Sequence, residues 1–362
     1  MTTAQRVRRA GVATAAALVI GGGGVAIGAA AADSSTPGTT AAAAATATPG
    51  PATSRGQAPA SYAGVVRQVL PSVVLIRTQN GLGSGVVLDR SGNIVTNAHV
   101  AGDATSFQVQ VAGDTAPRSA RLVGSYPPDD LAVIRVGNPA GLQPATFGDS
   151  DTVQAGDVVL AIGNPLGLSG SVTQGIISAT DRAVTEPSAD GSPAATLPGA
   201  IQTSAPINPG NSGGALVTTS GQVVGIPTLA AGSPQGGGQA QGIGFAIPSN
   251  LARDIATQII DTGHVTSSHR AALGAQVATV LGADGATGGV GVVAVTSGGG
   301  AERAGLRPGD VIKAVGGTPT PDATALTQAL AAAEPGDKVS VTISRDGRDR
   351  DVQVTLGELP GS

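Results

Sequence analysis

The chain has 362 residues, which gives room for two ordinary domains and additional segments. Its apolar fraction of 41% is enough for hydrophobic cores, whereas only 1% of the residues are aromatic and the formal net charge is −4. A sequence without a basic stripe or an aromatic platform gives no basis for nucleic-acid binding. The absence of cysteine excludes disulfides, thiolate metal sites and a cysteine nucleophile.

The N-terminal 32 residues predict an export segment. Three arginines, at positions 6, 8 and 9, precede an uncharged run over residues 10–32 that ends in three alanines. The run is long enough for a helix that spans a bilayer and remains as an anchor, and cleavage after the alanines is the alternative. In both cases the arginines stay in the cytoplasm and the rest of the chain crosses. Residues 33–60 are mostly Ala, Thr, Pro, Ser and Gly, which predicts a disordered linker.

The next part of the chain predicts short strands separated by turn residues. Many short β-branched segments at this spacing favour a sandwich or barrels. A helix is predicted at 249–262, where apolar residues recur at helical intervals, and it ends at Gly263. The predicted strands cover residues 72–78, 84–89, 93–100, 106–112, 131–136, 157–163, 171–180, 214–219, 222–228 and 242–248.

Ser212 lies in the glycine-rich segment NPGNSGGAL. In a chain with 56 glycines such a segment is either a flexible surface loop or a tight turn that presents a nucleophile. In the second interpretation, Gly210 and Gly213 permit the backbone turn. The N–H groups of Gly210 and Ser212 are then spaced to form an oxyanion hole.

His99 and Asp130 are the candidate partners of Ser212. The other two histidines follow the predicted helix in an apparent linker, and Asp130 precedes a predicted strand, with Asp129 as the rival carboxylate. Serine is a poor nucleophile at neutral pH, so an imidazole must take its proton and a carboxylate must orient that imidazole. The order His99, Asp130, Ser212 is that of chymotrypsin.

These segments resemble the HtrA/Deg family of serine proteases. TNAHV, DLAV and INPGNSGGAL carry the resemblance, and GLGSGVVL, AIGNPLGLSGSVTQGIISA and GIGFAIPSN extend it. The resemblance implies a mostly β protein, with a chymotrypsin-like double β-barrel over residues 61–263 and an active site between the barrels. It makes His99 the general base and acid, Asp130 the residue that orients His99, and Ser212 the attacking nucleophile.

Residues 271–359 resemble a PDZ domain. The segments ALGA and AGLRPGDVI match its pattern, and a helix is predicted at 322–333, followed by two strands joined by a hairpin turn. The resemblance places ALGA at the carboxylate-binding loop. There the backbone N–H groups of Leu273, Gly274 and Ala275 would bind the C-terminus of a peptide.

The leading hypothesis is an exported, ATP-independent serine endopeptidase that degrades unfolded or damaged proteins. The N-terminal helix would hold it in the cell membrane as a single-pass protein with both domains outside the cytoplasm, unless the segment is cleaved and the protein secreted. The resemblance implies unfolded proteins and C-terminal peptides as partners and a homo-oligomer, with a trimer suggested. It implies neither cofactor nor metal. One alternative is a PDZ-containing chaperone or peptide-binding scaffold with a silent protease domain, and another is an anchored structural spacer.

Overall fold

The structure is a computed structural model that describes residues 61–361 except 80, 165–169, 187–194, 209, 233–238 and 282–285. The predicted membrane helix in residues 1–32 and the predicted linker over residues 33–60 therefore lie outside the described residues. Within the described part of the chain, no helix combines the length and the apolar character that a bilayer span requires.

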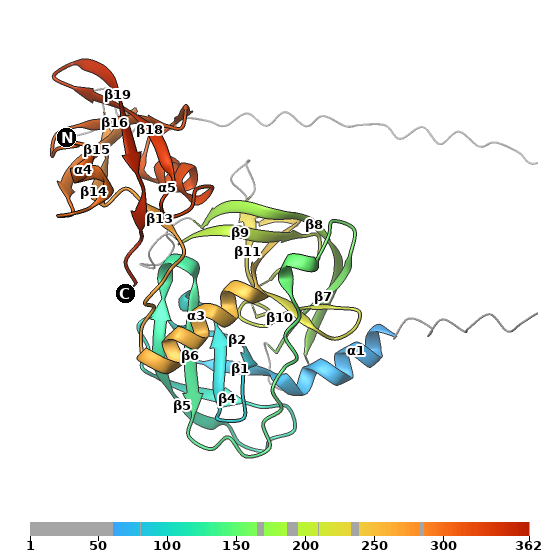
Figure 1. The fold of residues 1–362 in the computed structure, drawn as a ribbon. Coiled ribbons are helices and arrows are strands. Elements are labelled where there is room, and N and C mark those ends of the chain that lie inside the picture. The colour runs from blue at the N-terminus through green and yellow to red at the C-terminus, as the bar shows by residue number, and fades with distance from the viewer. Residues whose placement is uncertain are drawn as a thin grey trace, which may run out of the picture. The chain divides into compact units, whose positions relative to one another are not determined.

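The first β-barrel contains strands β1 to β6 and closes in the order β1-β2-β3-β6-β5-β4 (Figure 1). The sequence predicts five of these strands but not β5, in which arginine and serine interrupt the apolar pattern. Tertiary pairing with β4 and β6 holds β5 in place. The strands are Val73–Arg77, Leu82–Val87, Asn93–Thr96, Ser106–Gln110, Arg118–Tyr126 and Leu131–Val136.

The second barrel contains β7 to β12 and closes in the order β10-β11-β12-β9-β8-β7. Strand β9 is not predicted, because Pro198 and Gly199 disfavour a strand. It nevertheless pairs with both β8 and β12. The strands are Val158–Gly163, Ser171–Glu186, Ala195–Thr203, Ala215–Thr218, Val223–Gly232 and Gln239–Pro248.

Helices connect and cover the two barrels. Helix α1 (Tyr62–Val69) precedes the short η1 (Leu70–Ser72) and β1, and α3 (Ser249–Thr262) follows β12 and lies along β5 and β6 (Figure 1). One continuous apolar cluster includes Val73 from the first barrel, Leu160 from the second and Ile255 from α3. This shared core holds the two barrels together, so residues on facing strands can form one site. The remaining short elements are α2 (Ala98–Ala101), η2 (Pro127–Asp129) and η3 (Ser150–Thr152).

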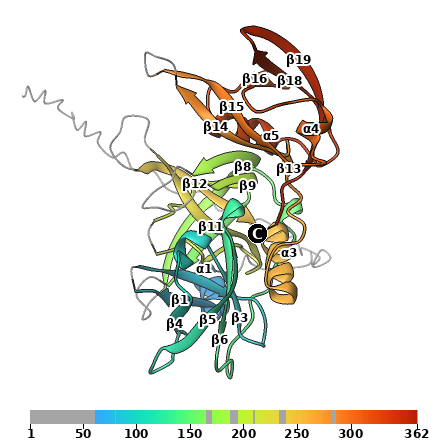
Figure 2. The same cartoon turned by 90° about the vertical axis from the view of Figure 1, so that its left-hand side faces the viewer.

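The C-terminal module has its own apolar core. Its main sheet has the order β14-β15-β16-β18-β19, and α5 lies beside β14 and β15 (Figure 2). Helix α5 starts after Asp322, whose Oδ1 accepts from the Ala325 N–H at 2.8 Å, as an N-cap does. The elements are β13 (Ala271–Ala272), β14 (Ala275–Leu281), β15 (Thr287–Val295), α4 (Gly300–Arg303), β16 (Val311–Val315), β17 (Thr318–Pro319), α5 (Ala323–Ala331), β18 (Lys338–Arg345), β19 (Arg348–Thr355) and β20 (Gly357–Glu358).

Candidate active site

His99 is held against Asp130 by both backbone and side-chain hydrogen bonds. The carboxylate of Asp130 accepts from the His99 N–H at 2.9 Å and from Nδ1 at 2.8 Å. The Asp130 carbonyl accepts from the Ala98 N–H and from the Asn97 side chain, both at 3.1 Å. Asp130 has φ +51, a left-handed conformation that aspartate tolerates better than most residues. With Nδ1 donating to the carboxylate, His99 is in the tautomer whose Nε2 can accept a proton.

Ser212 lies on the turn that leads into β10. Gly210 has φ +110 and Gly213 has φ +77, values that favour glycine. A Cβ atom on Gly213 would lie 2.3 Å from the Ser84 carbonyl oxygen, so the close approach of β2 also requires glycine there. The Ser212 hydroxyl donates to the Thr228 carbonyl at 3.1 Å. The tight turn of the sequence interpretation is therefore present, and it packs against the first barrel.

Thr228, on β11, is a site residue that the sequence interpretation missed. Its hydroxyl donates to Oδ2 of Asp130, the same oxygen that Nδ1 of His99 contacts. Both Thr228 and Asp130 are buried. A buried carboxylate needs such donors to offset the loss of its hydration. No local motif identifies Thr228, because its partner lies 98 positions away in the sequence.

The rival carboxylate, Asp129, lies in a different environment. Its Oδ1 accepts from Nη1 of Arg270 at 3.0 Å, and Arg270 also donates to the Pro128 carbonyl at 2.8 Å. Asp129 is fully buried. Burial raises the pKa of Asp129 to about 6, and the nearby Arg270 guanidinium offsets this effect only in part. The two adjacent aspartates thus have separate partners, and Asp130 is the one that contacts His99.

Comparison with known proteins is consistent with this geometry. Residues 83–226 match the trypsin-like peptidase domain, and residues 271–356 match the PDZ domain. The serine endoprotease DegS of Salmonella typhimurium is 37% identical over 85% of this chain and 89% of its own length. The chain belongs to the HtrA/Deg family of serine proteases. It is a serine endopeptidase with a trypsin-like peptidase domain and one PDZ domain.

Two further relatives lie in the HtrA/Deg family. Serine protease PepD of Mycobacterium tuberculosis is 41% identical over 83% of this chain and 67% of its own length. The solved structure of the HtrA-type protease AlgW with decapeptide is 35% identical, covers 83% of this chain and 99% of its own, and superposes with a TM-score of 0.55. The predicted mostly β fold, a chymotrypsin-like protease followed by a PDZ domain, is confirmed.

The PDZ loop of this HtrA/Deg protein connects β13 to β14. The Leu273 carbonyl accepts from the Ala301 N–H at 2.7 Å, and the Gly274 carbonyl accepts from the Thr296 N–H at 2.8 Å. Gly274 has φ +72, which again favours glycine. These bonds fix the carbonyl groups of the loop toward the body of the module. The binding role of the N–H groups of Leu273, Gly274 and Ala275 stays a prediction.

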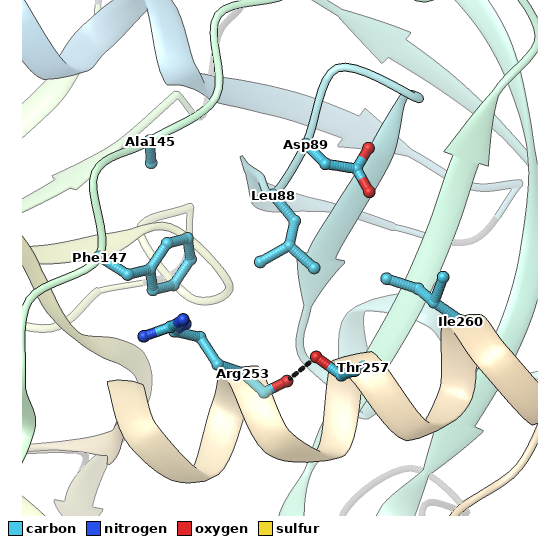
Figure 3. Close-up of a pocket in the computed structure, with 7 residues that line it drawn as sticks. All are labelled: Leu88, Asp89, Ala145, Phe147, Arg253, Thr257 and Ile260. Atoms are coloured by element: carbon cyan, nitrogen blue, oxygen red, sulfur yellow. Dashed lines mark hydrogen bonds between the residues drawn. The ribbon is translucent and has the colours of Figure 1, made fainter.

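A surface cavity of about 430 Å³ lies between α3 and the end of β2 (Figure 3). None of the predicted site residues lines it. The carboxylate of Asp89 in its wall already accepts from the N–H groups of Ser91 and Asn93. The lining residues are Leu88, Asp89, Ala145, Phe147, Arg253, Thr257 and Ile260. Nowhere in the described part of the chain do three or more histidine or acidic side chains gather as a metal site would require.

Proposed function

We propose that this HtrA/Deg protein hydrolyses unfolded or damaged proteins outside the cytoplasm, with Ser212 as its nucleophile. One observation carries the proposal: Thr228 forms hydrogen bonds with both Asp130 and Ser212, two of the three candidate catalytic residues. Its hydroxyl donates to the Asp130 carboxylate, which holds His99, and its carbonyl accepts from the Ser212 hydroxyl. Through Thr228, the three candidate catalytic residues thus belong to one hydrogen-bonded network, in which Asp130 and Thr228 are buried. Connected nucleophile, base and orienting carboxylate are what acyl transfer to serine requires.

The reaction begins when the Ser212 hydroxyl turns from the Thr228 carbonyl toward Nε2 of His99. Oγ attacks the peptide carbonyl carbon while Nε2 takes the hydroxyl proton, and Asp130 stabilises the resulting imidazolium. The N–H groups of Gly210 and Ser212 donate to the oxyanion. The tetrahedral intermediate collapses, the C–N bond breaks, and the leaving amine takes the proton from His99. A water molecule then repeats the sequence on the acyl-enzyme, with Ser212 as the leaving group.

Substitution of the nucleophile tests this mechanism. Ser212→Ala should abolish both cleavage of casein and labelling by a fluorophosphonate probe, because alanine has no hydroxyl that can attack the peptide carbonyl or the phosphorus of the probe. Ser220→Ala is the matched control, since Ser220 is an exposed serine near the end of β10 in the same barrel. Full cleavage by Ser212→Ala would overturn the assignment. A folded wild-type protein that binds unfolded casein without labelling would instead be the scaffold of the alternative hypothesis.

The PDZ domain supplies the second part of the proposal, in which it binds the C-termini of substrates. The peptide would lie along β14 beside α5, with its carboxylate on the N–H groups of Leu273, Gly274 and Ala275. The buried Leu273 and the fixed loop carbonyls support a rigid loop. Titration with a peptide and with its C-terminal amide tests this role. Equal affinities for the two peptides would remove the carboxylate loop from the mechanism.

We further propose that the N-terminal segment directs export and anchors the protein in the membrane. The arginines before the apolar run support an N-terminus inside the cell. The relatives include a protein named periplasmic pH-dependent serine endoprotease DegQ, from Escherichia coli. Protease added outside intact cells, after any outer envelope is permeabilised, should cut at residues 48–56. Cleavage there only after lysis of the cytoplasmic membrane would contradict export.

Self-association is the last part of the proposal. Tyr62 on α1 is 41% exposed, and on β8 Val172 is 38% and Ile176 is 41% exposed. Gln174 lies between Val172 and Ile176 on the same face of β8, and its side-chain amide donates to the Tyr62 hydroxyl at 3.2 Å. An exposed group of apolar side chains of this kind favours contact with a second copy. Light scattering of the wild type and of Tyr62→Ser tests it, and a monomeric wild type would contradict it.

A further inference from the structure

Ser84, on β2 of the first barrel, contacts the nucleophile turn of the second barrel through three of its atoms. Its hydroxyl donates to the Gly210 carbonyl at 2.5 Å, and its backbone N–H donates to the Ser212 carbonyl at 2.9 Å. Its own carbonyl lies so close to Gly213 that a Cβ atom there would be 2.3 Å away. Ser84 is fully buried. One residue thus holds the carbonyl groups of both residues whose N–H groups would form the oxyanion hole.

The Ser84 hydroxyl is itself held in place. It accepts from the backbone N–H of Asn164, which directly follows β7, at 2.8 Å. The carbonyl of Ser84 accepts from the Thr96 hydroxyl at 2.7 Å. Since a hydroxyl has one proton, acceptance from Asn164 leaves that proton for the Gly210 carbonyl. The fold therefore determines that the Ser84 hydroxyl donates its proton to the Gly210 carbonyl.

The Gly210 carbonyl is the point at which such a bond has most effect. A glycine at φ +110 has no side chain that selects this conformation, so several arrangements of its two peptide groups are accessible. The hydroxyl bond fixes the carbonyl, and the N–H of Asn211, in the same peptide group, donates to the Asn208 carbonyl at 3.1 Å. With this peptide group fixed on both sides, the backbone angles of Gly210, which set the direction of its N–H relative to the turn, have less freedom.

We propose that Ser84 is a positioning residue that aligns the oxyanion hole across the interface between the barrels. The proposal rests on the oxyanion hole of the proposed function. Ser84 does not touch the substrate. It holds the carbonyl groups of Gly210 and Ser212 and so limits the backbone rotations at these two residues, which keeps their N–H groups directed at the oxyanion position before charge develops. Preorganised donors of this kind stabilise the transition state more than the bound substrate.

Ser84→Ala tests the proposal on the full-length protein. The change removes the hydroxyl and leaves the backbone bond to Ser212. The kcat for a peptide that the wild type cleaves should fall roughly 10- to 100-fold, less than or equal to the loss of a direct oxyanion donor. The KM should change little, because the substrate contacts remain. Ser249→Ala is the matched control: Ser249 is a fully buried serine whose hydroxyl donates to the Gly148 carbonyl at 2.9 Å.

A second measurement separates alignment from general loss of stability. A peptide aldehyde adds to Ser212: Oγ bonds to the aldehyde carbon, the π electron pair moves to oxygen, and the hydroxyl proton passes to His99. The oxygen then occupies the oxyanion hole. The corresponding peptide alcohol has the same side chains but no carbonyl to attack. Ser84→Ala should lower the affinity for the peptide aldehyde by the same factor as it lowers kcat, and it should leave the affinity for the peptide alcohol unchanged.

The outcomes distinguish the two proposals. An active wild type in which Ser84→Ala keeps full kcat and aldehyde affinity overturns the role of Ser84 and leaves the proposed function intact. Equal losses of kcat in Ser84→Ala and Ser249→Ala also overturn it, since the effect would then be one of stability. A wild type that is inert toward substrate and aldehyde overturns both. If Ser84→Ala does not fold, Ser84→Cys, which retains a weak donor, takes its place and should give smaller losses of the same kind.

Discussion

Asp129→Asn should change how the stability of the protein depends on pH. Burial raises the pKa of Asp129 to about 6 in the folded protein, whereas the unfolded chain has the ordinary value of 3.8. Between these values the folded protein holds a proton that the unfolded chain has released. Tighter binding of this proton stabilises the folded protein. The stabilisation is fully present below the pKa of the unfolded chain and is lost as pH rises through the pKa of the folded protein. A difference of about two pKa units corresponds to roughly 3 kcal/mol of unfolding free energy.

Urea unfolding measures this effect, with Ser212→Ala in every sample to prevent autolysis. The unfolding free energy of Asp129→Asn minus that of its parent should rise by roughly 3 kcal/mol between about pH 4 and pH 7, because asparagine does not titrate. Asp103→Asn controls for the loss of one exposed carboxylate. A flat difference, or a change confined below about pH 4, would refute the reasoning. It would mean that Arg270 governs the pKa of Asp129 more strongly than burial does.

Substitutions at three further residues, with two control variants, test the site and the C-terminal module. Asp130→Asn should lower kcat about 10⁴-fold, because the amide no longer stabilises the correct imidazole tautomer, whereas Asp129→Asn should keep most of its kcat in the same peptide assay. Thr228→Val should lower kcat roughly tenfold by removing a donor to the Asp130 carboxylate, and Thr228→Ser, which keeps the hydroxyl, should not. Asp310→Ala should lower the free energy of urea unfolding by roughly 2 kcal/mol, because Arg345 loses its paired carboxylate; an equally stable variant would contradict this.

Local signals in the sequence account for much of the fold. The alternation of β-branched residues marks most strands, and glycine with φ +85 at position 263 ends α3 where the sequence predicts it. Strands β5 and β9 are missed because arginine, proline and glycine weaken the local pattern. Their pairing with neighbouring strands outweighs that weakness, since strand preference depends strongly on context.

The residues of the site likewise fall into two groups, those that local motifs reveal and those that only the fold brings together. Ser212, His99 and Asp130 come from short motifs that the sequence displays directly. Thr228 and Ser84 act through bonds to residues 98 and 126 positions away, which no local pattern encodes. The motif DLAV favours Asp130 over Asp129 in the sequence, but the physical reason comes from the fold. Asp130, at φ +51, has its carboxylate against His99, whereas Asp129 pairs with Arg270.

Thr228 gives the site a form of cooperativity. Its hydroxyl bonds to Asp130 and its carbonyl to Ser212. A displacement of β11 therefore removes a donor from Asp130 and an acceptor from Ser212 in a single event. The base and the nucleophile cannot then be disturbed one at a time through this strand. A ligand or partner that shifts β11 would change the number of competent molecules and leave the rate constant of each competent molecule unchanged.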